Sequence, residues 1–188
     1  MGYTNYWTQN KIDAIPDGLI YDIKKLFKCI YKNNYKYIYL VNKDNSDSES
    51  DNSDSDSDNN YKYNHYDDCC IYKLNSNRIE IHTPCEWFVV DNNKSGFEFC
   101  KTYGRWYDYI VKCLIMLSVH YNVIKNDWSD DGYHEDTIKK CKKVLNKIGY
   151  TIFNCNYNSE EGTYHLDMKK DTEKIIQFNT IEKYSVII

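Results

Sequence analysis

The most informative stretch for the fold is residues 107–121, which read Tyr-Asp-Tyr-Ile-Val-Lys-Cys-Leu-Ile-Met-Leu-Ser-Val-His-Tyr. Apolar side chains recur through it at helical spacing, and Asp108 and Lys112 are its only charged residues before His120. A helix that is apolar almost all round has to be buried. We therefore expect residues 107–121 to form a central helix packed across a sheet.

Two amphipathic helices are expected elsewhere in the chain. Residues 17–32 carry apolar side chains at helical spacing with lysines opposite, and Pro16 is typical of a first helical turn. A further helix is expected to begin at Asp131-Gly132 and to end at Gly149. Each of these helices has one apolar face to bury, so both should pack on a common core.

Short stretches rich in β-formers predict the sheet. The clearest is Arg78 to His82, which alternates as a half-buried strand should and follows the turn Asn75-Ser76-Asn77. The expected strands are about 37–41, 69–74, 78–82, 85–90, 97–100 and 151–155, with a short one at 123–124. Together these elements predict an α+β fold, with an antiparallel meander sheet of about 4–5 strands and about three helices in a single domain.

An acidic tract interrupts this domain. Residues 44–60 contain no apolar side chain, and seven acidic residues but no basic one lie between positions 44 and 58. Such a segment has nothing to bury, so we expect a disordered acidic Ser/Asp/Asn loop. The single domain is then 1–43 plus 61–158. Residues 159–188 are expected to be a C-terminal extension that could add edge strands, at 175–178 and 185–188.

Charge and hydropathy limit the kinds of partner and the cellular compartment that we expect. The net charge is −4, but 24 basic residues face 21 acidic ones outside the acidic tract. This balance argues against nucleic acid as a partner, whereas the tract favours a basic protein partner. No stretch of 18 apolar residues and no signal-like N-terminus is present, which predicts a protein that is neither membrane-spanning nor secreted. The eight cysteines are then expected to be thiols.

Two groups of residues are candidates for chemistry. His82 and Cys85 are three residues apart and are candidate metal ligands, although no second cysteine pair completes a tetrahedral zinc site.

An enzyme site would lie where the last meander strand meets the apolar helix, and its candidate residues are Glu86, Cys100, Lys101, Thr102, Tyr107 and Asp108. No catalytic signature surrounds them. We therefore expect no cofactor, and action by binding in preference to catalysis.

A further hypothesis is a single-stranded nucleic-acid binder that stacks bases on Tyr and Trp side chains. The chain has 20 Tyr and four Trp. However, Asn, Tyr, Ile and Lys fill 83 of the 188 positions, and all four have A/T-rich codons. This bias indicates an AT-rich genome, so the aromatic and basic content is a poor indicator of nucleic-acid binding.

Four short motifs occur together in the chain: Tyr3-Thr4-Asn5-Tyr6-Trp7-Thr8-Gln9-Asn10, Cys85-Glu86-Trp87-Phe88, Phe99-Cys100-Lys101-Thr102 with Tyr107-Asp108 behind it, and Ser129-Asp130-Asp131-Gly132. The combination resembles uncharacterised small proteins of mimivirus-type giant viruses and similar hypothetical proteins of phages and bacteria. The resemblance spans residues 3–148 and carries no assigned activity, so it implies no catalytic residue. It implies a viral accessory protein of the host cytoplasm or virus factory, with packaging in the virion as an open alternative. The leading hypothesis is accordingly a viral binding module without enzymatic activity.

Overall fold

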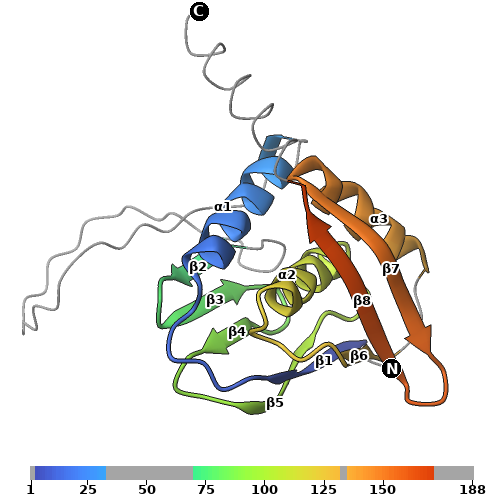
Figure 1. The fold of residues 1–188 in the computed structure, drawn as a ribbon, viewed down its shortest axis with the longest axis horizontal. Helices are drawn as coiled ribbons and strands as arrows, with labels where there is room; N and C mark the ends of the chain where they lie inside the picture. Colours follow the sequence, from blue (N-terminus) through green and yellow to red (C-terminus); the bar gives the residue numbers. More distant parts are fainter. Residues whose placement is uncertain (1–2, 33–69, 132–134, 172–188) are drawn as a thin grey trace, which may run out of the picture.

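The computed structural model describes residues 3–32, 70–131 and 135–171 (Figure 1). Its elements are, in chain order, β1 (Thr4–Gln9), α1 (Asp17–Lys32), β2 (Cys70–Leu74), β3 (Arg78–His82), β4 (Phe88–Asp91), β5 (Gly96–Lys101), α2 (Asp108–His120), β6 (Ser129–Asp130), α3 (Glu135–Lys147), β7 (Tyr150–Asn158) and β8 (Thr163–Lys170). The described residues thus contain three helices and several antiparallel strands. The expected α+β class is confirmed.

Helix α2 forms the centre of the molecule. It packs against α1 and α3 and also contacts β1 and β8 (Figure 1). Every residue from Asp108 to Ser118 is buried, whereas in α3 only Ile138, Cys141 and Leu145 are buried. Because α2 has no polar face to turn toward water, the other elements assemble around it. The expected burial is confirmed for residues 107–118, while residues 119–121 are half-buried.

The strands divide among three small antiparallel sheets. Strands β2, β3 and β4 form a meander in that order, as expected for this part of the chain. Strand β5 leaves the meander and pairs with β1, which also pairs with β6, so the second sheet has the order β5–β1–β6. Strands β7 and β8 form a separate hairpin.

Strand β1 is not predicted by the hydropathy pattern, and its pairing with β5 separates β5 from the meander. Asn5, Trp7 and Gln9 are buried, while Tyr6 and Thr8 are half-buried on the other face. Two of the three inward residues are polar, so hydropathy conceals the two-residue period of the strand. The Trp7 ring lies 5.0 Å from the ring of Phe88 in β4, and this contact joins the two three-stranded sheets.

Two boundaries differ from expectation. Strand β4 begins at Phe88 and not at residue 85, because a turn in which the Thr83 hydroxyl donates to the Glu86 carbonyl precedes it. Residues 163–170, which were expected to belong to a C-terminal extension, form β8 and pair with β7. Tyr164 and Leu166 are buried in the common core, so this hairpin contributes to it.

Other expectations fall on residues that the structure does not describe. These are the strands at 37–41, 175–178 and 185–188 and the acidic loop at 44–60. Among the described residues, no helix is both long and apolar enough to cross a membrane.

Candidate functional site

The two charged side chains of α2 meet other polar groups inside the core. Asp108 and Lys112 are four residues apart, so they lie on the same side of the helix. The Lys112 side chain is 0% exposed, and its Nζ lies 2.7 Å from Asp130 Oδ2 and 3.3 Å from Asp108 Oδ2. The same Nζ donates to Asn5 Oδ1 at 2.9 Å. We call the set of Asn5, Asp108, Lys112 and Asp130, together with Tyr3 and Thr102, the Lys112 cluster.

The remaining members tie the cluster together. Asp108 Oδ1 accepts hydrogen bonds from Asn5 Nδ2 at 2.9 Å and from Thr102 Oγ1 at 2.6 Å. The Tyr3 hydroxyl donates to Asp130 Oδ2 at 2.7 Å and accepts from Lys112 Nζ at 2.7 Å. Burial, followed by the hydrogen bond to Asp130, raises the pKa of Tyr3 well above its ordinary value. One lysine therefore faces two aspartates in a site closed to water.

The structure brings the sequence-predicted enzyme residues together only in part. Thr102 and Asp108 belong to the Lys112 cluster, and Tyr107 is buried with its ring edge-on to Trp106 at 5.7 Å. The other three, Glu86, Cys100 and Lys101, lie close together near the end of β5. There, Glu86 accepts a hydrogen bond from the Lys101 backbone N–H at 2.9 Å, and its second carboxylate oxygen lies 3.3 Å from Lys101 Nζ. Glu86 thus satisfies a backbone donor at the strand edge.

Cys100 lies in an environment that suppresses thiolate formation. Its side chain is buried, and its Sγ lies 3.5 Å from the Glu86 backbone carbonyl. Burial, followed by the negative charge of Glu86, raises the pKa of Cys100 to about 12. A nucleophilic cysteine needs the opposite shift, so the geometry gives Cys100 a packing role.

This thiol makes stability depend on pH. In the unfolded chain Cys100 ionises near pH 8.5, and in the folded chain only near 12. We expect the free energy of unfolding to fall by about 1.4 kcal/mol per pH unit for this thiol above about pH 9. Urea denaturation at about pH 8 and about pH 9.5 measures the slope at pH values where most tyrosine side chains are still protonated. The Cys100→Ala variant should show a shallower slope, and an equal slope in both proteins would contradict the assignment.

The candidate metal pair is not assembled into a site. His82 Nε2 lies 3.0 Å from Glu80 Oε1, and the His82 ring stacks on Trp87 with centroids 3.8 Å apart. Cys85 is exposed. Within residues 3–32, 70–131 and 135–171, no group of three or more His, Cys, Asp or Glu side chains could hold a metal ion. Arg78 contacts both Glu80 and Asp91 of β4, so His82, Glu80 and Arg78 form a row of polar contacts along β3.

Aromatic side chains are exposed on the outer face of β1 and β5. Phe97 is 67% exposed and Phe99 is 47% exposed. Tyr6 of the neighbouring strand stacks on Phe97 with centroids 5.9 Å apart, and its hydroxyl donates to Asp131 at 2.8 Å. Lys101 Nζ lies 5.8 Å from the centre of the Phe99 ring. We call Tyr6, Phe97, Phe99 and Lys101 the β5 aromatic face.

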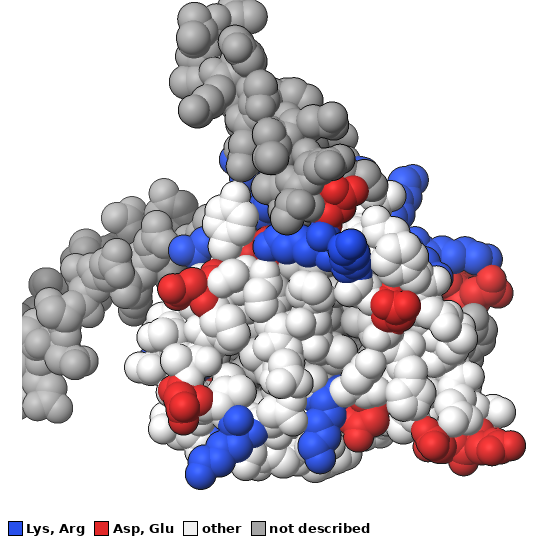
Figure 2. Space-filling view, viewed as in Figure 1, with Lys and Arg blue, Asp and Glu red and all other residues white. Residues whose placement is uncertain are grey.

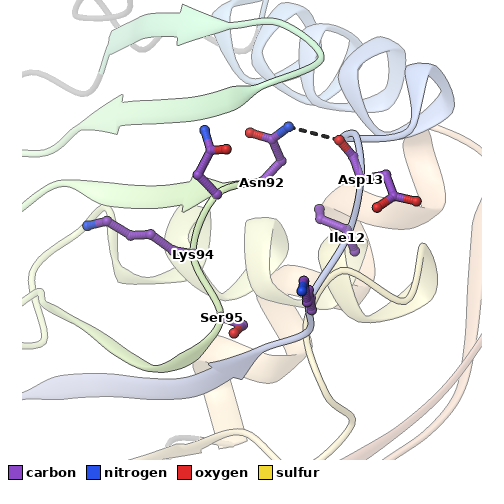
Figure 3. Close-up of a pocket in the computed structure, with 7 residues that line it drawn as sticks. Ile12, Asp13, Asn92, Lys94 and Ser95 are labelled. Atoms are coloured by element: carbon purple, nitrogen blue, oxygen red, sulfur yellow. Dashed lines mark hydrogen bonds between the residues drawn. The ribbon is translucent and has the colours of Figure 1, made fainter.

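A polar pocket of about 450 Å³ lies beyond the end of the same strand pair (Figure 3). It lies between the loop after β1 and the turn between β4 and β5, and its lining residues are Lys11, Ile12, Asp13, Asn92, Asn93, Lys94 and Ser95. Asn92 Nδ2 donates to the Asp13 carbonyl at 2.9 Å, and Lys94 extends from the turn away from Asp13 (Figure 3). None of the sequence-predicted site residues lines this pocket.

A second buried polar group surrounds Asp22 of α1. The Asp22 side chain is 0% exposed, and its Oδ2 accepts from Tyr121 and Tyr150 hydroxyls at 2.5 Å each and from Lys170 Nζ at 2.6 Å. Its Oδ1 is buried and has no hydrogen-bond partner within the part of the chain that the structure describes. The Lys170 ammonium lies 5.6 Å from the centre of each tyrosine ring. We call Asp22, Tyr121, Tyr150 and Lys170 the Asp22 cluster, which ties α1 to the end of α2 and to the β7–β8 hairpin.

No pattern in the sequence identifies Lys112, Asn5 and Asp130 as a group. One signal was present, because a lysine inside an otherwise apolar helix must be buried with partners. Its partners could not be named, since Asn5 lies on the unanticipated β1 and Asp130 lies in a two-residue strand. A comparison with family models, with curated proteins and with solved structures finds no match to this chain.

Proposed function

We propose that the protein is a binding module without enzymatic activity, and that the β5 aromatic face receives an extended segment of a protein partner. The observation that carries this proposal is the exposure of Phe97 and Phe99 on a strand at the edge of its sheet. Exposed aromatic clusters on soluble proteins mark interaction sites, and aromatic side chains dominate interface energetics. The role in virus infection that the resemblance implies stays a prediction.

The backbone of β5 supports strand addition as the mode of binding. Among the described strands, β5 pairs only with β1. The Lys101 N–H points away from β1 and bonds the Glu86 side chain. Peptide groups two residues apart in a strand point the same way, so the N–H groups of Phe97 and Phe99 face the same free edge. A partner strand would bond these groups and pack its side chains on the two rings.

The charges favour a protein over a nucleic acid. Lys101 on the aromatic face is neutralised by Glu86, and Tyr6 is bonded to Asp131. On the side of the molecule in Figure 2, basic and acidic residues are interspersed around a broad area with few charged side chains. A nucleic-acid surface needs a run of unpaired cations that follows the phosphates. The acidic tract at 44–58 would add a second contact for a basic partner.

Loss of the two rings tests the proposal. We expect peptides selected from a displayed random library on the wild-type chain to bind at least about tenfold more weakly to Phe97→Ser and to Phe99→Ser, because each ring is an interface anchor. Fluorescence anisotropy measures the affinities, and thermal unfolding checks the fold. Phe153→Ser is the matched control, because Phe153 is 62% exposed on β7, in a different sheet, and should leave binding unchanged.

Two outcomes would overturn the proposal. One is that no peptide is enriched, or that all enriched peptides bind the Phe97→Ser and Phe99→Ser variants unchanged. The other is that a fluorescein-labelled oligothymidine binds the same face and loses affinity in the same variants while peptides do not bind. That result would assign the face to single-stranded nucleic acid.

A further inference from the structure

The Lys112 cluster places an amine next to a side-chain amide inside the core. Lys112 Nζ lies 2.9 Å from Asn5 Oδ1, and both side chains belong to fully buried residues. The two residues are on different elements, α2 and β1, and are far apart in the chain. A nucleophile and an acyl group held in contact react as if at very high concentration.

A carboxyl group stands between the two nitrogens that a reaction between them would involve. Asp108 Oδ1 accepts a hydrogen bond from Asn5 Nδ2 at 2.9 Å, and Asp108 Oδ2 lies 3.3 Å from Lys112 Nζ. The Thr102 hydroxyl fixes Asp108 by donating to Oδ1 at 2.6 Å. Asp108 is therefore positioned to accept a proton from the lysine nitrogen and to deliver one to the amide nitrogen.

A second carboxylate can remove the charge of the ammonium. Asp130 Oδ2 lies 2.7 Å from Lys112 Nζ, and the Asp130 side chain is also 0% exposed. Transfer of one proton across this contact would turn the buried ion pair into a neutral amine and a carboxylic acid. The lysine is then an amine with a free electron pair, as nucleophilic attack requires.

We propose that Lys112 and Asn5 form an intramolecular isopeptide bond in the folded chain. Lys112 Nζ attacks Asn5 Cγ, the new Nζ–Cγ bond forms, and the Cγ–Nδ2 bond breaks. The lysine nitrogen gives one proton to Asp130 and a second to Asp108, and Asp108 passes its proton to the departing nitrogen. The products are a secondary amide and ammonia, and no oxidant, reductant or other co-reactant takes part.

The surroundings favour this reaction over hydrolysis. The Lys112 ammonium lies 4.7 Å from the centre of the Tyr3 ring and 5.8 Å from that of Trp128, which is itself buried. With these aromatic walls the site excludes bulk water, which would otherwise compete with the amine for Cγ. The resulting bond would fasten β1 to the central helix independently of the β5 aromatic face.

Intact mass spectrometry of the denatured full-length chain tests the proposal. Isopeptide formation removes ammonia, so the folded protein should weigh about 17 Da less than its sequence. Refolding from a preparation kept unfolded throughout should convert the sequence mass into the lower mass. The variants Lys112→Arg, Asn5→Ala and Asp108→Asn should retain their sequence masses. After digestion, the peptide containing Asn5 should be recovered joined to the peptide containing Lys112.

Each alternative gives a distinct result. A wild-type chain at its sequence mass overturns the proposal whether or not the variants fold. A loss of about 18 Da would mean that Asp130 or Asp108, and not Asn5, has condensed with the lysine. A loss of about 17 Da that persists in Lys112→Arg would indicate cyclisation of an asparagine elsewhere. Either result contradicts the assigned bond.

Discussion

The Lys112→Met variant is expected to unfold about 3–5 kcal/mol more easily than the wild-type chain, because removing one partner of a buried charged group leaves the others uncompensated. Methionine has a similar length but no donor. Asp130 would lose the ammonium 2.7 Å away but keep the Tyr3 hydroxyl as a donor, and Asp108 would lose the cation 3.3 Å away. Urea denaturation followed by circular dichroism measures the loss.

Three further variants isolate the cause. Lys139→Met is the matched control, because Lys139 is 63% exposed in its contact with Glu135, and exposed pairs contribute at most about 1 kcal/mol. Neutralising the carboxylates as well, in Lys112→Met with Asp108→Asn and Asp130→Asn, should recover part of the loss. Asn5→Ala removes the proposed cross-link but keeps the Lys112 side chain, so it separates loss of the cross-link from loss of the lysine. A Lys112→Met variant within about 1 kcal/mol of wild type would contradict the expected role of the buried lysine.

The second large effect is expected at the Asp22 cluster. Asp22→Ala removes the shared acceptor of two tyrosine hydroxyls and the Lys170 ammonium, and we expect a loss of about 3 kcal/mol or more. Buried donors left without an acceptor bear the full cost of lost hydration, which explains the size of the effect. Thermal unfolding at pH 7 measures it, and hydrogen exchange should show the greatest loss of protection in β8.

Single-hydroxyl variants calibrate this result. Tyr121→Phe and Tyr150→Phe each remove one donor and leave the carboxylate with the other two, so each should cost about 1 kcal/mol. Burial, followed by the hydrogen bond to Asp22, raises the pKa of Tyr150 above its ordinary value. If Asp22→Ala lowers the free energy of unfolding no more than either phenylalanine variant does, the Asp22 carboxylate is not the shared acceptor that stabilises the cluster.

The two buried clusters depend on charged residues whose partners local sequence patterns do not reveal. Lys112 lies on α2 four residues after Asp108, a spacing that is visible in the sequence. Its closest partner, Asp130, comes from β6, and Asn5 comes from β1. These contacts join residues that are distant in the chain, so local spacing carries no information about them. Asp22 and Lys170 are a similar pair, at opposite ends of the described chain.

At the predicted enzyme site, the sequence correctly predicts which residues are neighbours but not the environment of each side chain. Glu86, Cys100 and Lys101 do lie together, as expected from neighbouring strands. What the strands could not reveal is the direction of each group: Glu86 bonds a backbone N–H, and Cys100 points into the core. Adjacency followed from the sequence, whereas reactivity depended on burial.

The sequence by itself determined the α+β class, the three helices, the β2–β3–β4 meander and the burial of α2, because these depend on hydropathy repeating at a period of 3.6 or 2 residues. Only the tertiary structure decided that β1 takes β5 as its partner, that β8 joins the core, and that Lys112 meets Asn5 and two aspartates. Strand pairing and buried polar contacts depend on which elements come together across the core. Their energy arises from groups brought together only after the chain has folded, so no local pattern records it.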